Sequence, residues 1–204
     1  MQTRPELIAQ LADVGAEFHG RGWLMATGGN LSALFGAADG SVRVVMTASG
    51  GHKGRLTPDD FVDVALQGPL PTTGRRPSAE VGVHRAVYAL GNVGAVLHVH
   101  SPYVTLVSRA FAPESTVQFA GFEFVKALGF WEPGAVVDAP IVPNHHDLDA
   151  LAAAVGQAAT SASPCPGVLV AGHGLYAWGA TVADARRHVE AFEFLCHMVW
   201  ESRR

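Results

Sequence analysis

Three short β-like runs follow one another in the first third of the chain, and they limit its possible folds more than any other feature. The runs NLSALF, SVRVVMTAS and FVDVALQ occupy residues 30–35, 41–49 and 61–67, with Gly, Asp and Pro between them. A parallel pair of strands needs a crossover of a dozen or more residues, usually containing a helix. Since these connections are too short for a crossover helix, the sequence predicts an antiparallel meander.

Helices are predicted on both sides of this meander and at both ends of the chain. Apolar residues recur at helical spacing over residues 5–20, 78–90, 102–111, 147–159 and 181–204. Further strands are expected in the runs AVLHVHS and VVDAPIVP and in a hairpin formed by GVLVAGHGLYAWG. The segment VQFAGFEFVKALGFW mixes both patterns and gives no assignment. The fold class is therefore α/β, with a mainly antiparallel or mixed sheet covered by helices.

Length and charge narrow the class of protein. The 204 residues fit one domain, 1–204. The 14 Lys and Arg against 18 Asp and Glu argue against a protein that binds the phosphate backbone of nucleic acids, so we expect no nucleic-acid partner. No apolar run reaches the ~18 residues of a membrane span. Arg4, Glu6 and Asp13 stand where a signal peptide would be apolar. We expect a cytoplasmic protein without a membrane partner.

Three histidines are the candidates for a metal site. His98 and His100 lie two residues apart in the run AVLHVHS, so on a strand both imidazoles point to the same face. His173 lies between two glycines in a second β-like run. Three protein nitrogens with one open position are typical of a catalytic zinc. The two cysteines form no C-x-x-C pair, which excludes a closed thiolate site.

Two glycine-bearing turns are candidates for anion binding. They have the sequences TGGNLS, at residues 27–32, and TASGGHK, at residues 47–53. Such turns can present several backbone N–H groups to one anion, and Ser78 stands at a predicted helix N-terminus, where phosphate is favoured. Taken alone, each sequence is more typical of a plain turn than of an anion site. The segment GHKGR lacks the G-K-[S/T] ending of a P-loop, and no G-x-G-x-x-G or G-x-S-x-G is present.

Taken in order, the segments TGGNLS, TASG, PSAE with His84, AVLHVHS and GHGLYAWG resemble the class II aldolase/adducin family across nearly the whole chain. This resemblance implies a three-layer αβα domain. It also implies a homotetramer whose active sites lie near subunit borders, and the low charged fraction of 16% agrees with surface hidden between subunits.

The resemblance also assigns roles to residues. It implies that His98, His100 and His173 bind one Zn²⁺ per subunit and that the substrate phosphate is held by Gly29, Asn30, Ser49, Gly50 and Ser78.

Two glutamates could serve as the acid/base group. The segments GGHKGRL, FEFVK and HGLYAWG are most similar to the dehydratase branch of the family, in which Glu123 would be catalytic. Glu80 matches the base of the aldolases. We favour Glu123 because Phe122, Phe124 and Phe130 are close in sequence, and apolar surroundings raise the pKa of a carboxyl group toward the working range of a general acid.

The implied substrate is a small phosphorylated ketose, 5-methylthioribulose 1-phosphate, which a zinc-dependent lyase of methionine salvage would dehydrate. Two alternatives remain open. A class II aldolase would use the same zinc site to cleave a fuculose- or ribulose-type ketose phosphate. A scaffold domain of the adducin type would be non-catalytic, but that reading requires the loss of metal ligands that are present in this sequence.

Overall fold

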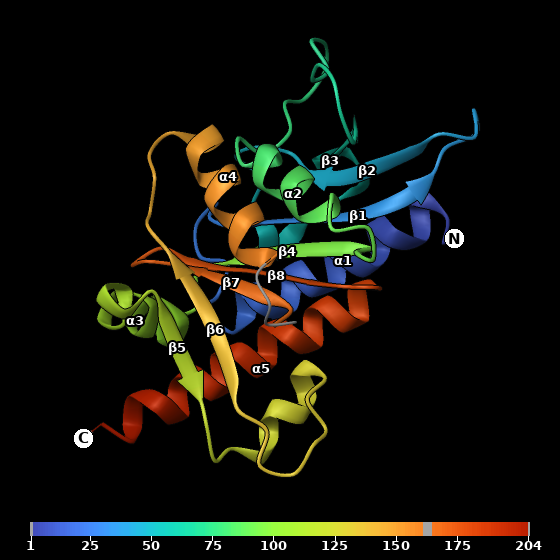
Figure 1. Cartoon of the computed structure of the whole chain (residues 1–204). Coiled ribbons are helices and arrows are strands. Elements are labelled where there is room, and N and C mark those ends of the chain that lie inside the picture. The colour runs from blue at the N-terminus through green and yellow to red at the C-terminus, as the bar shows by residue number, and fades with distance from the viewer. Residues whose placement is uncertain (1, 161–164, 204) are drawn as a thin grey trace.

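The central feature of the fold is an eight-stranded sheet, seen in a computed structural model that describes residues 2–160 and 165–203. The strand order is β3-β2-β1-β4-β8-β7-β6-β5 (Figure 1). The strands are β1 (Asn30–Gly36), β2 (Val42–Thr47), β3 (Phe61–Ala65), β4 (Ala95–Val99), β5 (Thr116–Phe119), β6 (Val137–Val142), β7 (Gly167–Val170) and β8 (Gly174–Gly179). Among these strands only β6 and β7 pair in parallel. The predicted antiparallel meander and the mixed sheet are both confirmed.

Helices cover both faces of the sheet, which makes three layers. They are α1 (Arg4–Gly20), α2 (Val81–Tyr88), α3 (Pro102–Ala110), α4 (Leu148–Ala159) and α5 (Val182–Glu201). Helices α2 and α4 lie on one face, and α1, α3 and α5 lie on the other (Figure 1). Each face has its own apolar core, since Val83 and Leu151 belong to one buried cluster and Leu11 and Phe192 to the other. The expected αβα architecture of the class II aldolase type is confirmed.

Short 3₁₀ turns fill several connections. They are η1 (Lys53–Arg55), η2 (Pro58–Asp60), η3 (Ala112–Glu114) and η4 (Glu123–Leu128). The segment that the sequence left unassigned becomes strand β5 followed by η4, which ends at Gly129 with φ of +96°. Its mixed pattern thus reflects two elements in sequence. None of the helices in residues 2–160 and 165–203 is long and apolar enough to cross a bilayer.

The register of three adjacent strands brings the candidate site together at one edge of the sheet. Asn30 on β1 pairs with His98 on β4, and His98 pairs with Tyr176 on β8. Close backbone approach at this edge depends on glycine. A Cβ atom on Gly174 would lie 2.2 Å from the carbonyl oxygen of Val99, and one on Gly29 would lie 2.6 Å from that of His98. Gly29 also has φ of +71°, which side-chain-bearing residues rarely adopt.

Candidate active site

The three predicted metal ligands converge. His98 lies on β4, His100 follows the end of that strand, and His173 lies in the turn between β7 and β8. His98 Nε2 is 2.9 Å from His100 Nε2, and one nitrogen from each of the three rings lies within 4.8 Å of the other two. The alternation of β4 therefore does place both of its histidines toward one point, and the β7–β8 turn supplies the third.

The imidazoles of this cluster are neutral at neutral pH. Burial lowers the pKa of His98 and of His173, and it lowers the pKa of His100 to about 4. His98 Nδ1 is 3.0 Å from the carbonyl oxygen of Leu175, which can only accept, so Nδ1 carries the proton and Nε2 presents its lone pair to the cluster. Three neutral imidazoles are a donor set that suits zinc. The residues present therefore fit a bound divalent metal ion.

Glu80 lies directly beside these histidines. Its Oε2 is 3.3 Å from His98 Nε2 and its Oε1 is 3.7 Å from His173 Nε2. Asn30 Nδ2 donates to Oε2 over 2.7 Å. Burial alone would raise the pKa of Glu80, but His98, the Asn30 hydrogen bond and His173 outweigh it and lower the pKa to about 2. The structure thus places an ionised carboxylate at the metal site, where it can accept a proton from a ligand.

An open hollow of about 390 Å³ leads to this cluster. Its lining includes Glu80, His100 and His173, together with His145 and His146 from the connection between β6 and α4. His146 is exposed and His145 is partly exposed, and both stand at the mouth of the hollow. They reach it because β6 and β7 run parallel and end at the same edge of the sheet.

The predicted phosphate residues gather at the same edge. Ala48 forms a β-bridge with Pro77, and Ser49 N–H donates to the carbonyl of Arg76, so the turn around Ser49 and Gly50 lies against the segment with Ser78. Glu80 N–H donates to Ser78 Oγ over 3.3 Å. Helix α2 begins at Val81, so Ser78 stands in the turn before the helix.

Lys53 is a residue of this region that sequence reasoning passed over. Its side chain is buried, and Nζ donates to the carbonyl oxygens of Thr27, at 3.0 Å, and Gly51, at 2.9 Å. The lysine therefore ties the two glycine-bearing turns together. Its place inside GGHKG was the available signal, but only the structure shows which carbonyls it reaches.

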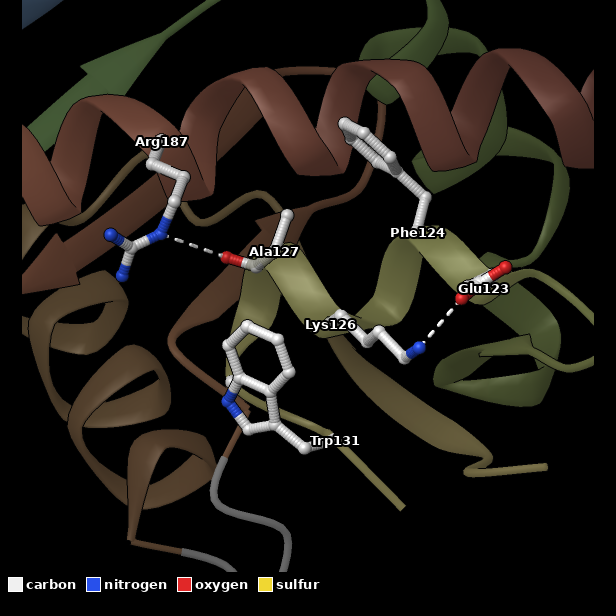
Figure 2. A pocket seen from close by; sticks show the side chains of 7 residues that line it. Glu123, Phe124, Lys126, Ala127, Trp131 and Arg187 are labelled. Atoms are coloured by element: carbon white, nitrogen blue, oxygen red, sulfur yellow. Dashed lines mark hydrogen bonds and ion pairs between the residues drawn. The ribbon is translucent and has the colours of Figure 1, made fainter. Parts of the chain in front are cut away.

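Glu123 lies elsewhere, and its expected environment was wrong. The side chain is 82% exposed, and its Oε1 pairs with Lys126 Nζ at 2.6 Å (Figure 2). The hydrogen bond and charge of Lys126 lower the pKa of Glu123, where the sequence predicted an apolar setting and a raised pKa. Sequence neighbours misled the prediction because, along η4, successive side chains point in different directions. Phe124 itself is exposed.

Strand β6 separates Glu123 from the histidines of its own chain. Phe119, just before η4, pairs with Val137 at the start of β6, whereas Val142 at its other end pairs with Val170, just before His173. The five residue steps between Val137 and Val142 span about 17 Å at ~3.3 Å per residue. Figure 1 shows η4, in yellow, beyond the far end of β6. Within one chain, Glu123 and the metal site are at opposite ends of this strand.

The chain has a three-layer αβα fold, with a three-histidine cluster and a carboxylate at one edge of its mixed sheet. This combination is typical of a metal-dependent enzyme. Residues 9–200 match the family described as Class II Aldolase and Adducin N-terminal domain. The chain belongs to this family.

Relatives and solved structures agree with this membership. The chain is 40% identical to a protein of Hahella chejuensis named methylthioribulose-1-phosphate dehydratase, over 91% of this chain and 88% of that protein. It is 37% identical to a protein of the same name from Persephonella marina, over 95% of this chain and 89% of that protein.

Among solved structures, YgbL of Klebsiella pneumoniae, described as a putative aldolase/epimerase/decarboxylase, superposes with a TM-score of 0.82 at 27% identity, covering 98% of this chain and 91% of that one. The L-fuculose-1-phosphate aldolase of Thermus thermophilus superposes with a TM-score of 0.79 at 25% identity, covering 98% and 97%.

Proposed function

We propose that this protein is a metal-dependent lyase that dehydrates 5-methylthioribulose 1-phosphate to 2,3-diketo-5-methylthiopentyl 1-phosphate, a step of methionine salvage. The observation that carries the proposal is the convergence of His98, His100, His173 and Glu80. All of these except the fully buried His98 line one hollow. The relatives of 37–41% identity named as this dehydratase support the choice of substrate.

Zn²⁺ is the proposed metal, with His98, His100 and His173 as its ligands, and when bound it would supply Lewis-acid polarisation of the ketose oxygens. Gly29, Asn30, Ser49, Gly50 and Ser78 are the proposed phosphate residues. Their turns meet beside Glu80, and backbone N–H groups in such turns bind anions without needing a charged side chain.

Two carboxyl groups carry out the two proton transfers of the reaction. Glu80, ionised at neutral pH, accepts the proton from C3 of the ketose. A proton delivered to the C4 hydroxyl releases it as water, and the resulting enol, with its double bond between C3 and C4, tautomerises to the 2,3-diketone. Atoms balance, since one C–H and one C–O bond break and one water leaves.

We assign delivery of that proton to Glu123 of a neighbouring copy, in a cytoplasmic homotetramer. Two observations support action between subunits: β6 separates Glu123 from its own histidines, and the surface around it exposes large apolar side chains. Phe124 and Phe194 form an exposed ring pair with centroids 4.5 Å apart, and Trp131, in the same hollow as Glu123, is 71% exposed. Such patches are typical of subunit interfaces, and burial there would raise the pKa of Glu123 toward that of a general acid.

Complementation between subunits tests this assignment. Glu123→Gln should keep its metal and lose turnover, and His98→Ala should lose both. Assemblies of mixed subunits, formed by coexpression, should recover activity, because some sites combine intact histidines from one copy with Glu123 from another. Glu114→Gln, a change at another exposed acid, is the control. Full activity of Glu123→Gln alone would refute a catalytic role, and failure of the mixed assemblies to recover would refute action between subunits.

An aldolase is the second candidate, favoured by the superposition on the L-fuculose-1-phosphate aldolase and by the position of Glu80 at the metal site. It would break the C3–C4 bond of the ketose and release an aldehyde. Product analysis separates the two reactions, because dehydration keeps the carbon chain intact and cleavage does not.

A further inference from the structure

A chain of buried polar groups leads from the active-site carboxylate into the apolar layer between β1 and α2. Asn30 and Ser32 lie two residues apart on β1, and Glu80, His84 and Tyr88 lie four residues apart at the start of and along α2. Both spacings keep side chains on one face of their element. The two polar faces meet where the surrounding side chains, such as those of Val83, Val87 and Val96, are apolar.

The side chains of strand and helix alternate along this polar chain. Asn30 Nδ2 is 2.7 Å from Glu80 Oε2, and Asn30 Oδ1 is 2.5 Å from His84 Nε2. Ser32 Oγ is 2.6 Å from His84 Nδ1 and 2.7 Å from Tyr88 Oη. Ser32 and His84 are 0% exposed, so these contacts are not shared with bulk water. We call Asn30, His84, Ser32 and Tyr88 the buried relay.

The orientation of the Asn30 amide fixes the direction of every hydrogen bond in the relay. Asn30 Nδ2 donates to Glu80 Oε2, so the carbonyl oxygen of the same amide faces His84. His84 must then donate from Nε2. In a neutral imidazole Nδ1 then accepts, so the Ser32 hydroxyl donates to it, and Tyr88 donates to Ser32. Burial lowers the pKa of His84 to about 4, which keeps the ring neutral.

We propose that the buried relay positions Glu80 for the proposed reaction, by holding His84 as the Nε2–H tautomer and so fixing which atom of the Asn30 amide faces the carboxylate. The inference rests on the proposed function only in giving Glu80 a substrate proton to accept. An Asn30 amide turned over would set its carbonyl oxygen against the carboxylate, and the repulsion would move Glu80 away from His98 and His173. Ser32, His84 and Tyr88 touch neither substrate nor metal and are positioning residues, whereas Asn30 is also one of the proposed phosphate residues.

Substitutions at His84 separate positioning from simple packing. The amide of His84→Gln can donate to Asn30 and accept from Ser32, whereas His84→Leu fills the space and does neither. We expect His84→Leu to lower kcat by about 10- to 100-fold with KM and bound metal unchanged, and His84→Gln to restore most of that loss. Val83→Ala, a buried change on the same helix outside the relay, is the control for lost packing.

Ser32→Ala provides a second variant should His84→Leu not fold. It removes the hydroxyl that donates to Nδ1, so only the Asn30 carbonyl still favours the Nε2–H tautomer and the preference between the two tautomers weakens. Nitrogen-15 NMR of the histidine rings in the metal-loaded protein reads this directly, with the His84 signals assigned from His84→Gln. We expect a protonated Nε2 and an unprotonated Nδ1 in the original protein, and a mixture of tautomers in Ser32→Ala.

The outcomes distinguish this inference from the proposed function. A protonated Nδ1 in the original protein, or equal losses of kcat in His84→Gln, His84→Leu and Val83→Ala, would overturn the relay. If the original protein does not turn over 5-methylthioribulose 1-phosphate, the proposed function fails, but the tautomer of His84 still decides the relay.

Discussion

The burial of His84 predicts how the folding stability of the protein changes in acid. Its side chain is fully buried, and desolvation lowers its pKa from the ordinary value of 6.5 to about 4 in the folded protein. As the pH falls below 6.5, the unfolded chain takes up a proton at this position that the folded chain refuses until about pH 4. The stability contributed by neutral His84 is therefore present above pH 6.5 and is lost between pH 6.5 and 4.

The size of the loss follows from the shift. One pKa unit corresponds to ~1.36 kcal/mol, so the full pKa difference of about 2.5 units corresponds to about 3.4 kcal/mol of unfolding free energy. About 2 kcal/mol of this contribution should be lost at pH 5. His84→Gln carries no titrating group at this position, so its free energy of unfolding should fall by about 2 kcal/mol less between pH 7 and pH 5.

Urea unfolding of the metal-free proteins at the two pH values measures this difference. The metal is removed because protons also compete for the ligand histidines. The other buried histidines titrate in both proteins, so the comparison isolates His84. Equal pH dependence of the two proteins, within ~0.5 kcal/mol, would show that the folded state accepts a proton on His84 and would refute the reasoning.

Three further predictions concern the edge of the sheet that holds the site. His98→Ala should abolish stoichiometric metal binding and lower activity by at least about 10³-fold, as measured by elemental analysis and turnover, and retention of the metal would contradict the ligand assignment. Gly29→Ala should lower the free energy of unfolding by more than the ~1–2 kcal/mol that a positive φ costs a residue with a side chain, because the new Cβ would also meet the His98 carbonyl. Gly22 also has a positive φ but open space around it, so Gly22→Ala should show only the cost of the positive φ in chemical denaturation. Ser49→Ala and Ser78→Ala should each raise KM for the phosphorylated ketose by about 10-fold with little effect on kcat, and an unchanged KM in both would place the phosphate elsewhere.

Local sequence patterns predicted the elements and part of the site. The pair His98 and His100 could be placed on one strand face because the strand period is two residues, and the short connections near Gly36 correctly indicated antiparallel strands. The meeting of His173 with this pair depends on β8 pairing with β4, which rested on the family resemblance and not on any local pattern.

Contacts between elements that are distant along the chain could not be predicted from local sequence patterns. The relay residues follow the spacings N-x-S on β1 and E-x-x-x-H-x-x-x-Y along α2, but neither spacing predicts that these two faces pack together. His188 is a second case, since a polar residue of an amphipathic terminal helix gives no local sign of burial. It is only 8% exposed, and its Nδ1 donates to the Trp178 carbonyl, because α5 packs back over β8.

Glu123 shows how sequence neighbours can mislead. The nearby phenylalanines suggested a desolvated carboxyl group, but η4 turns Glu123 outward to Lys126 and places it beyond the far end of β6. Its role as the proton donor remains a prediction. That role now requires a second copy of the chain, which a single sequence cannot reveal.

One measurement tests the central claim most directly: elemental analysis of the purified protein together with identification of the product formed from 5-methylthioribulose 1-phosphate. The account predicts one zinc per chain and a 2,3-diketone 1-phosphate that differs from the substrate by the loss of one water. A metal-free, folded and active protein, or an aldehyde formed by cleavage of the carbon chain, would contradict it.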